Sequence, residues 1–200
     1  QDSIEQFIIY YNQKNFSLSK TKIKPSIFES NLLLTDKKLL FSKENSIITE
    51  KELTLIEYAT LFGSVQICRF LFLNQVEFNS SLWIYAIHSN NPEIIHLLET
   101  NDVNLIDIDF CLQEAIKCHH NDIANYFINK NFTSLDEGCN NSIRYAIKYY
   151  NFALINMNYI NKSLFYDLCK YDYYPLVYEL FKSVDCKEMQ TRISIHISNI

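Results

Sequence analysis

A small residue recurs along the middle of this chain inside one pattern of larger residues, and this repeat constrains the fold more than any other feature. A large apolar or aromatic residue stands three positions before each small residue, and apolar residues follow eight and eleven or twelve positions after it. The intervals between the small residues are 27, 29, 31 and 23 residues. Such spacing is typical of apolar helix faces, so we expect a repeated pair of helices. The small residues are Ala59, Ala86, Ala115, Ala146 and Cys169.

Residues suited to start a helix precede each small residue by five or six positions. Their side-chain oxygens can accept a hydrogen bond from a backbone N–H of the first helical turn. Thr54 and Glu57 also have the spacing of a capping box. The predicted caps of the first helices are Thr54, Ser81, Asp109, Asn141 and Ser163.

The second helix of each unit is expected to start about five residues after the small residue. Ser64, Asn91 and Asn151 can cap these helices there, and Pro92 and Pro175 stand where a first-turn proline is tolerated. Second helices are expected to stop at asparagines that replace the usual left-handed glycine. These asparagines are Asn74, Asn101, Asn131 and Asn161.

Gly63 is one of only two glycines, and it falls in the expected turn between two helices. A glycine there can adopt the positive φ that ends a helix. Tyrosine tolerates that conformation poorly, so the turns that carry one should differ in shape or be strained. The positions equivalent to Gly63 are Asn90, His119, Tyr150 and Tyr173.

The stretch TLIEYATLFGSVQICRFLFL, residues 54 to 73, resembles the ankyrin-repeat consensus T-P-L-H-x-A-A-x-x-G-H-x-x-I-V-x-x-L-L. The stretches SLWIYAIHSNNPEIIHLLE and CLQEAIKCHHNDIANYF look like divergent, asparagine-rich ankyrin-type domains of unicellular eukaryotes. The resemblance implies an all-α solenoid of stacked antiparallel helix pairs. The intervals are shorter than the ankyrin period of about 33 residues, so the β-hairpin fingers should be shortened or absent. A tetratricopeptide-like array is the alternative fold.

The pattern divides the chain into three parts. Residues 1–50 should form an N-terminal helical cap and a connecting segment, since SIEQFIIYYNQ has a possible Ser3–Gln6 capping box before an apolar face. Residues 51–182 should hold the repeats, and 183–200 the possible start of another. The expected repeats are 54–80, 81–108, 109–140, 141–162 and 163–182.

Charge and composition narrow the location and the partners. The net charge is −5 with a sequence pI of about 5.5, which disfavours nucleic acid as the partner. The sequence contains no apolar run of the roughly 18 residues that a membrane span needs. Six cysteines without a C-x-x-C pair fit a reduced chain with buried thiols. We therefore expect a cytoplasmic, possibly cytoskeletal, protein that is not inserted in a membrane.

Catalytic patterns are sparse. With two glycines the chain has no P-loop, no G-x-G-x-x-G and no G-x-S-x-G. The densest group of metal-ligating or acid–base residues is Cys118, His119, His120 and Asp122, which falls on an inter-helix turn where the ankyrin pattern itself has Gly-His. We expect no enzyme activity, cofactor or metal, with catalysis by Cys118, His119 or His120 as an alternative hypothesis.

A stack of helix pairs offers a concave face, and ankyrin arrays commonly bind ligands through the ends of their first helices. The resemblance therefore implies a protein-binding stripe two and three positions past each small residue. Leu61 and Phe62 would leave this stripe if the N-terminal cap buries them. The predicted partner-binding residues are Leu61, Phe62, His88, Ser89, Lys117, Cys118, Lys148, Tyr149, Tyr171 and Asp172.

Tyrosine occurs 14 times and gathers late in the chain, where it can serve either the core or an interface. Tyr145, Tyr166 and Tyr178 are at core-like offsets, whereas Tyr149, Tyr171 and Tyr174 are interface candidates. The sequence favours a non-catalytic interaction module or adaptor for protein partners. The alternative is a structural subunit embedded permanently in a larger cytoskeletal or multi-subunit assembly.

Overall fold

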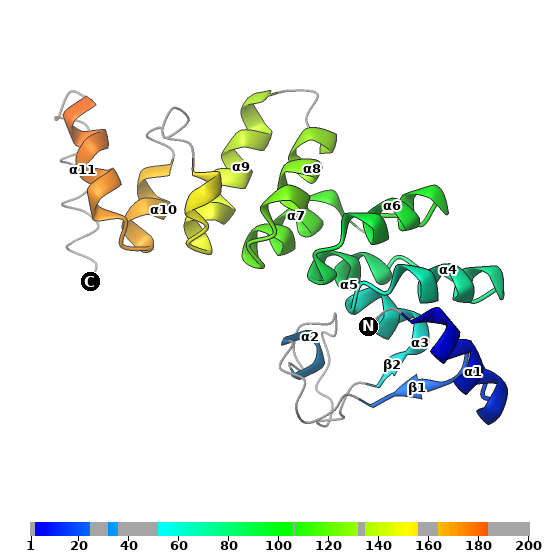
Figure 1. Ribbon diagram of the computed structural model, residues 1–200. Coiled ribbons are helices and arrows are strands. Elements are labelled where there is room, and N and C mark those ends of the chain that lie inside the picture. The colour runs from blue at the N-terminus through cyan, green and yellow to red at the C-terminus, as the bar shows by residue number, and fades with distance from the viewer. Residues whose placement is uncertain are drawn as a thin grey trace, which may run out of the picture. The chain divides into compact units, whose positions relative to one another are not determined.

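The structure is a computed structural model that describes residues 3–24, 32–35, 52–105, 107–131, 135–155 and 164–183 (Figure 1). The described chain is mostly helical, with one two-stranded sheet. It divides into two compact units, Gln1–Asp107 and Ile108–Ile200. None of the described helices has both the length and the apolar character to cross a membrane.

The first unit contains six helices and two short strands among its described residues. Its elements are α1 (Ile4–Lys14), β1 (Lys22–Ile23), α2 (Leu32–Thr35), β2 (Leu53–Thr54), α3 (Leu55–Leu61), α4 (Val65–Leu73), α5 (Leu82–Ser89) and α6 (Pro92–Thr100).

The N-terminal helix α1 packs on α4 through aromatic side chains. The Phe7 and Tyr11 rings lie edge-on to Phe70, with centroids 5.8 Å and 6.2 Å away. The expected Ser3–Gln6 capping box does not form, because the Ser3 side chain makes no cap hydrogen bond. The N-terminal segment also contributes a strand, since β1 pairs antiparallel with β2 beside α3.

Helices α3 to α6 form two consecutive helix pairs. Helix α3 packs on α4 and on α5, and α5 and α4 each pack on α6. The small residues lie where the first helices meet, since Ala59 is 5% and Ala86 0% exposed. An alanine there lets the backbones approach closely, and Trp83 closes the second pair by donating its Nε1–H to the Val103 carbonyl at 3.1 Å.

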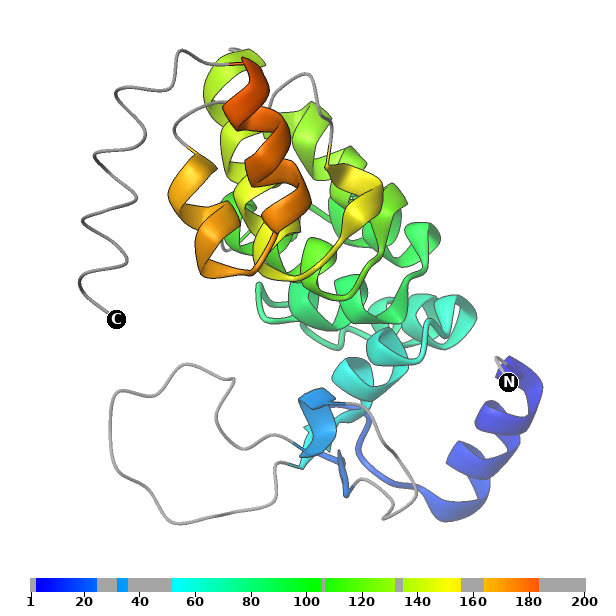
Figure 2. The same ribbon diagram turned by 90° about the vertical axis from the view of Figure 1, so that its left-hand side faces the viewer.

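The second unit repeats the same arrangement with different lengths. Its described elements are α7 (Ile108–Lys117), α8 (Asn121–Asn131), α9 (Leu135–Lys148), the 3-10 turn η1 (Phe152–Leu154), α10 (Phe165–Lys170) and α11 (Tyr174–Ser183). Helix α9 packs on both α7 and α10, and α10 packs on α11. Figure 2 shows α10 and α11 side by side, as Figure 1 does. Only one 3-10 turn of the helix expected after Ala146 is described.

The same turn ends the first helix of all five repeats. One residue has a positive φ, and its N–H returns to the carbonyl three residues earlier, as in a Schellman motif. The left-handed residues are Gly63 (φ 66°), Asn90 (51°), His119 (59°), Tyr150 (56°) and Asp172 (61°).

The register predicted for the last repeat is wrong by one residue. Asp172, not Tyr173, is left-handed, and the Tyr173 N–H bonds to the Leu168 carbonyl at 2.8 Å, as His120 bonds to Ala115 at 3.0 Å. Leu168, which is 0% exposed, therefore stands at the position assigned to Cys169. The small-residue rule failed here because this last position accommodates a leucine.

The expectation that asparagine takes the left-handed position after second helices is also wrong. Asn74 and Asn101 have φ of −92° and −102°, and the residues that follow them, Gln75 and Asp102, are left-handed instead. The asparagine side chains donate to the Phe70 and Leu97 carbonyls at 2.8 Å and 2.7 Å. The two side chains thus donate hydrogen bonds to carbonyl groups in the last turns of α4 and α6. Asn131 ends α8, and Asn161 lies outside the described residues.

Among the predicted caps of first helices, Thr54 forms the full capping box with Glu57. Ser81 makes no cap hydrogen bond, and Asp109 and Asn141 lie inside helices that start earlier, at Ile108 and Leu135. Ser163 lies outside the described residues.

The caps of second helices are also mixed. Asn91 accepts from the Glu93 N–H beside a first-turn Pro92, as predicted. Ser64 and Asn151 precede their helices but make no cap hydrogen bond with their side chains. Pro175 occupies the first turn of α11.

The tyrosine assignments need one correction. Tyr166 and Tyr178, expected in the core, are 58% and 62% exposed, because the last repeat is shifted in register. Tyr145 is half-buried, and its hydroxyl donates to Asp109 at 2.5 Å. Cys68, Cys111, Cys118 and Cys169 form no disulfide bond, and the first two of them are buried.

Candidate protein-binding surface

The ends of the first helices hold the ten predicted partner-binding residues, and we describe each unit separately. In the first unit, Leu61 is 4% exposed and belongs to the core, whereas Phe62 is 50% exposed and its ring lies 4.6 Å from that of Tyr58. Leu61 therefore leaves the predicted stripe, whereas Phe62 remains in it.

His88 and Ser89 end α5, and both are half-buried. The Ser89 hydroxyl donates to the Ala86 carbonyl at 2.7 Å and accepts from the Asn91 N–H at 3.2 Å. In the other repeats, the N–H of the residue after the left-handed one bonds directly to the carbonyl five residues earlier. Here the Ser89 hydroxyl bridges the two groups. Ser89 is thus already committed to the turn.

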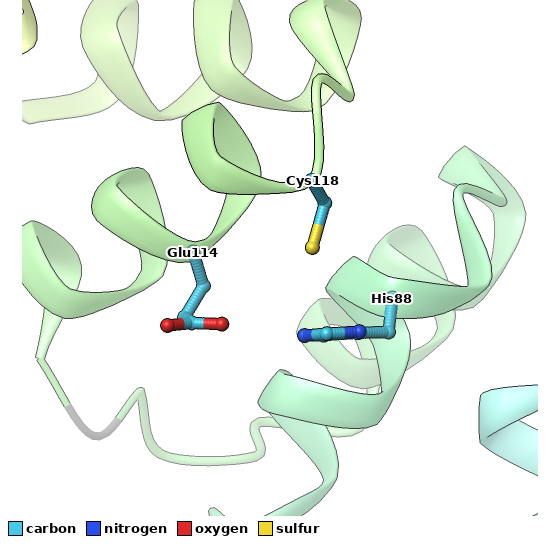
Figure 3. A group of neighbouring side chains, drawn as sticks. All are labelled: His88, Glu114 and Cys118. Atoms are coloured by element: carbon cyan, nitrogen blue, oxygen red, sulfur yellow. The ribbon is translucent and has the colours of Figure 1, made fainter. Parts of the chain in front are cut away.

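The buried carboxylate of Glu114 lies near the end of α7, beside the turn that follows this helix. Figure 3 shows Glu114, which lies on α7, and Cys118, which follows directly after the end of α7, together with His88 of α5 in the first unit. The Lys117 ammonium contacts both oxygens of the 5%-exposed Glu114, at 3.1 Å and 3.2 Å. Burying a carboxylate is costly unless it is paired, so Lys117 is held by an internal ion pair.

The thiol of Cys118 is held in its protonated form. Burial and the neighbouring Glu114 charge raise its pKa from 9.0 to about 11, and Lys117 only partly offsets them. A thiol, unlike a thiolate, is a poor nucleophile and metal ligand. His119 is exposed at the left-handed position of the turn, and Asp122 is exposed in the first turn of α8. The environment of Cys118 therefore disfavours nucleophilic use of this thiol.

The turns after α9 and α10 form the most regular part of the predicted surface. The Lys148 ammonium lies 4.9 Å from the centroid of the Tyr149 ring, and that of Lys170 lies 5.4 Å from the centroid of Tyr171. The Tyr149 hydroxyl accepts from the Gln113 side chain of α7 at 2.8 Å. Each lysine is therefore stacked on the tyrosine that follows it, in equivalent turns of neighbouring repeats.

Three residues of this surface were not predicted. Lys170 was missed because the last repeat was aligned on Cys169, although AIKCH, AIKYY and LCKYD at residues 115–119, 146–150 and 168–172 align on the lysine. Gln113 and Tyr150 were missed as well. The Tyr150 ring stacks on Tyr173 at 5.7 Å, a contact that sequence spacing does not reveal.

Asp172, predicted to contact a partner, is instead the left-handed residue of its turn. Its carboxylate accepts from the Tyr174 hydroxyl at 2.9 Å, and both side chains are exposed. The carboxylate and this hydrogen bond raise the pKa of Tyr174 above its ordinary value.

No protein-family model matches this chain, and no curated protein or solved structure matches it significantly.

Proposed function

We propose that this chain is a non-catalytic, protein-binding module built as an ankyrin-like array of helix pairs. The observation that carries the proposal is the recurrence of one turn geometry after α3, α5, α7, α9 and α10. Each such turn carries side chains two and three positions past the buried residue on which the repeats align, which is Ala59, Ala86, Ala115, Ala146 or Leu168. A repeated backbone with variable residues at fixed positions suits recognition of protein partners.

The proposed module acts in the cytoplasm, without a cofactor or metal. Reduced thiols are usual in that compartment, and Cys68 and Cys111 are each 1% exposed and form no disulfide bond. The raised pKa of Cys118 agrees with a structural role for the one turn that carries potential catalytic residues.

Site-specific photocrosslinking tests this proposal. A photoreactive amino acid would replace exposed Phe62 or Lys148 at the turns, and exposed Lys130 on second helix α8 as the control. After irradiation with native lysate, we expect discrete protein adducts from the turn positions and none at the control. Equal labelling at all three positions, or no adduct at the turns, would contradict the proposal.

A permanent structural subunit is the second candidate, because several large apolar side chains are exposed. Leu73 at the end of α4 is 79% and Phe152 in η1 is 68% exposed. Such residues would be covered in an assembly. Light scattering of the isolated chain distinguishes the candidates: a monodisperse monomer supports the adaptor, and aggregation that is relieved by Leu73→Ser and Phe152→Ser supports the subunit.

A further inference from the structure

The strongest chemical signal outside the backbone repeat is the set Lys148, Tyr149, Lys170 and Tyr171, which we name the lysine–tyrosine row. Its two lysines are the last residues of α9 and α10, and these helices pack on each other. The Tyr150 hydroxyl also donates to the Tyr171 carbonyl at 3.5 Å, which joins the two turns. The row is therefore one continuous feature of the second unit.

The two lysines of the row have no carboxylate partner among the residues that the structure describes. Both are exposed, and each ammonium lies over a tyrosine ring. Lys117, at the same position of the preceding repeat, is instead neutralised by Glu114. A positively charged lysine in the last turn stabilises its own helix through the helix dipole. This stabilisation does not need a tyrosine after the lysine, so it does not explain why the lysine–tyrosine pair recurs.

Three of the described carboxylates of this unit have partners of their own. Asp167 pairs with Arg144 at 3.4 Å, Asp109 accepts from Tyr145, and Asp172 accepts from Tyr174. The exposed ammonium groups of Lys148 and Lys170 stay available in a chain whose net charge is −5. These two positive charges are what an acidic ligand would recognise.

We propose that the lysine–tyrosine row binds an acidic, extended peptide segment of a protein partner. This inference rests on the proposed protein-binding function and adds the chemistry of its partner. The partner's carboxylates would accept from the Lys148 and Lys170 ammonium groups, while its intervening apolar side chains pack on Tyr149 and Tyr171. Cation–π contact with the rings orients both ammonium groups before binding, which lowers the entropy lost in forming the ion pairs.

The test measures fluorescence anisotropy of the full chain with a labelled peptide of glutamate interspersed with leucine. The same peptide with glutamine in place of glutamate, and an oligothymidylate, serve as competing probes. We expect the glutamate peptide to bind, the glutamine peptide to bind much more weakly, and added salt to weaken the glutamate complex. Absence of binding, or equal binding of both peptides, would overturn the inference.

A matched set of variants locates the site. Lys148→Gln with Lys170→Gln should weaken the glutamate complex by roughly twofold to thirtyfold, since two exposed ion pairs are lost. The control double variant, Lys130→Gln with Lys14→Gln, removes the same charge from two exposed lysines outside the row, of which Lys130 also lies over a tyrosine ring, Tyr126 at 5.4 Å, but on α8. It should leave the affinity unchanged. An equal loss in both variants would show that only net charge matters and would contradict the row as the site.

The remaining outcomes separate this inference from the proposed function. Preferential binding of oligothymidylate, lost in the double variant, would assign the row to single-stranded nucleic acid and overturn the peptide proposal. If the turns crosslink a protein in lysate but the double variant captures it equally well, the module binds proteins and the acidic-peptide inference fails. If neither crosslinking nor peptide binding occurs, both proposals fail.

Discussion

The two units form the same turn between helices but stabilise it with different residues. The first unit uses Gly63 and Asn90, which adopt positive φ readily. The second unit uses His119 and Asp172, residue types that are also enriched at positive φ, and Tyr150, which is poorly suited to it. A left-handed residue with a β-carbon costs roughly 1–2 kcal/mol. The Tyr150 turn therefore indicates that the packing of the helix pairs can impose this conformation, and that side-chain contacts can offset unsuitable local chemistry.

The compensating contacts in the second unit are visible around Tyr150 and Asn151. The Tyr150 ring stacks on Tyr173 with an interplanar angle of 14°. The Asn151 side chain, 1% exposed, donates to the Ile116 carbonyl at 3.0 Å and to Asn121 at 2.8 Å. In the first unit, Asn91 makes a single bond of this kind, to the Gly63 carbonyl at 3.1 Å.

The largest expected effect tests the corrected register of the last repeat. Leu168→Ala should lower the free energy of unfolding by about 2–5 kcal/mol, because a fully buried leucine is replaced by a cavity. Cys169→Ala, at the neighbouring half-buried position, should cost much less. Urea unfolding of the full chain, followed by circular dichroism, measures both. A larger loss for Cys169→Ala would restore the register expected from sequence.

The next effect compares the two inter-repeat asparagines. Asn151→Ala should cost about 1–3 kcal/mol, because the Ile116 carbonyl loses its side-chain donor at a buried site. Asn91→Ala should cost about 1 kcal/mol, mainly through the lost cap on Glu93. Thermal unfolding of the two variants gives the order. Equal losses would show that the second unit does not depend more strongly on this contact.

Smaller effects of opposite sign are expected at equivalent turn positions. Gly63→Ala should destabilise by about 1 kcal/mol, since the positive φ is strained and a β-carbon would lie 3.3 Å from the Asn91 amide nitrogen. His119→Gly should stabilise by up to about 1 kcal/mol because that strain is relieved. Tyr150→Gly should stabilise less than His119→Gly, because the stacking on Tyr173, worth about 0.5–1.5 kcal/mol, is lost together with the strain. Chemical denaturation of the three variants checks these effects, and a Tyr150→Gly variant that is stabilised as much as His119→Gly would show that the stacking does not offset the strain.

The last effect concerns the pH dependence of the turn that contains Cys118. Its pKa is raised from 9.0 to about 11 in the folded chain, so the unfolded chain loses this proton first. The thiol therefore contributes stability below pH 9.0, and this contribution disappears as the pH rises toward about 11. The difference in unfolding free energy between wild type and Cys118→Ser should fall across that window. A constant difference would mean that the thiol is not buried beside Glu114.

The repeat of apolar and small residues was enough to predict a helical chain and the turn at Gly63, and the apolar face of SIEQFIIYYNQ predicted the N-terminal helix. These features depend on local chemistry: the period of apolar residues, the Thr54–Glu57 box, and the freedom of glycine. The same local chemistry misplaced Asp109 and Asn141 as helix caps, because tertiary packing extends the helices that contain them. It also assigned the left-handed position to asparagines whose neighbours take it.

The sequence by itself determined most of the helix pairs and where the first four of the first helices end, because periodicity and turn residues act within a few neighbours along the chain. Only the tertiary structure decided which of the ten predicted residues are available to a partner. It buried Leu61, paired Lys117 with Glu114, and left Lys148 and Lys170 on tyrosine rings. The physical reason is that burial and charge pairing are set by residues brought together across helices and turns, and repeat spacing does not encode how each side chain is satisfied there.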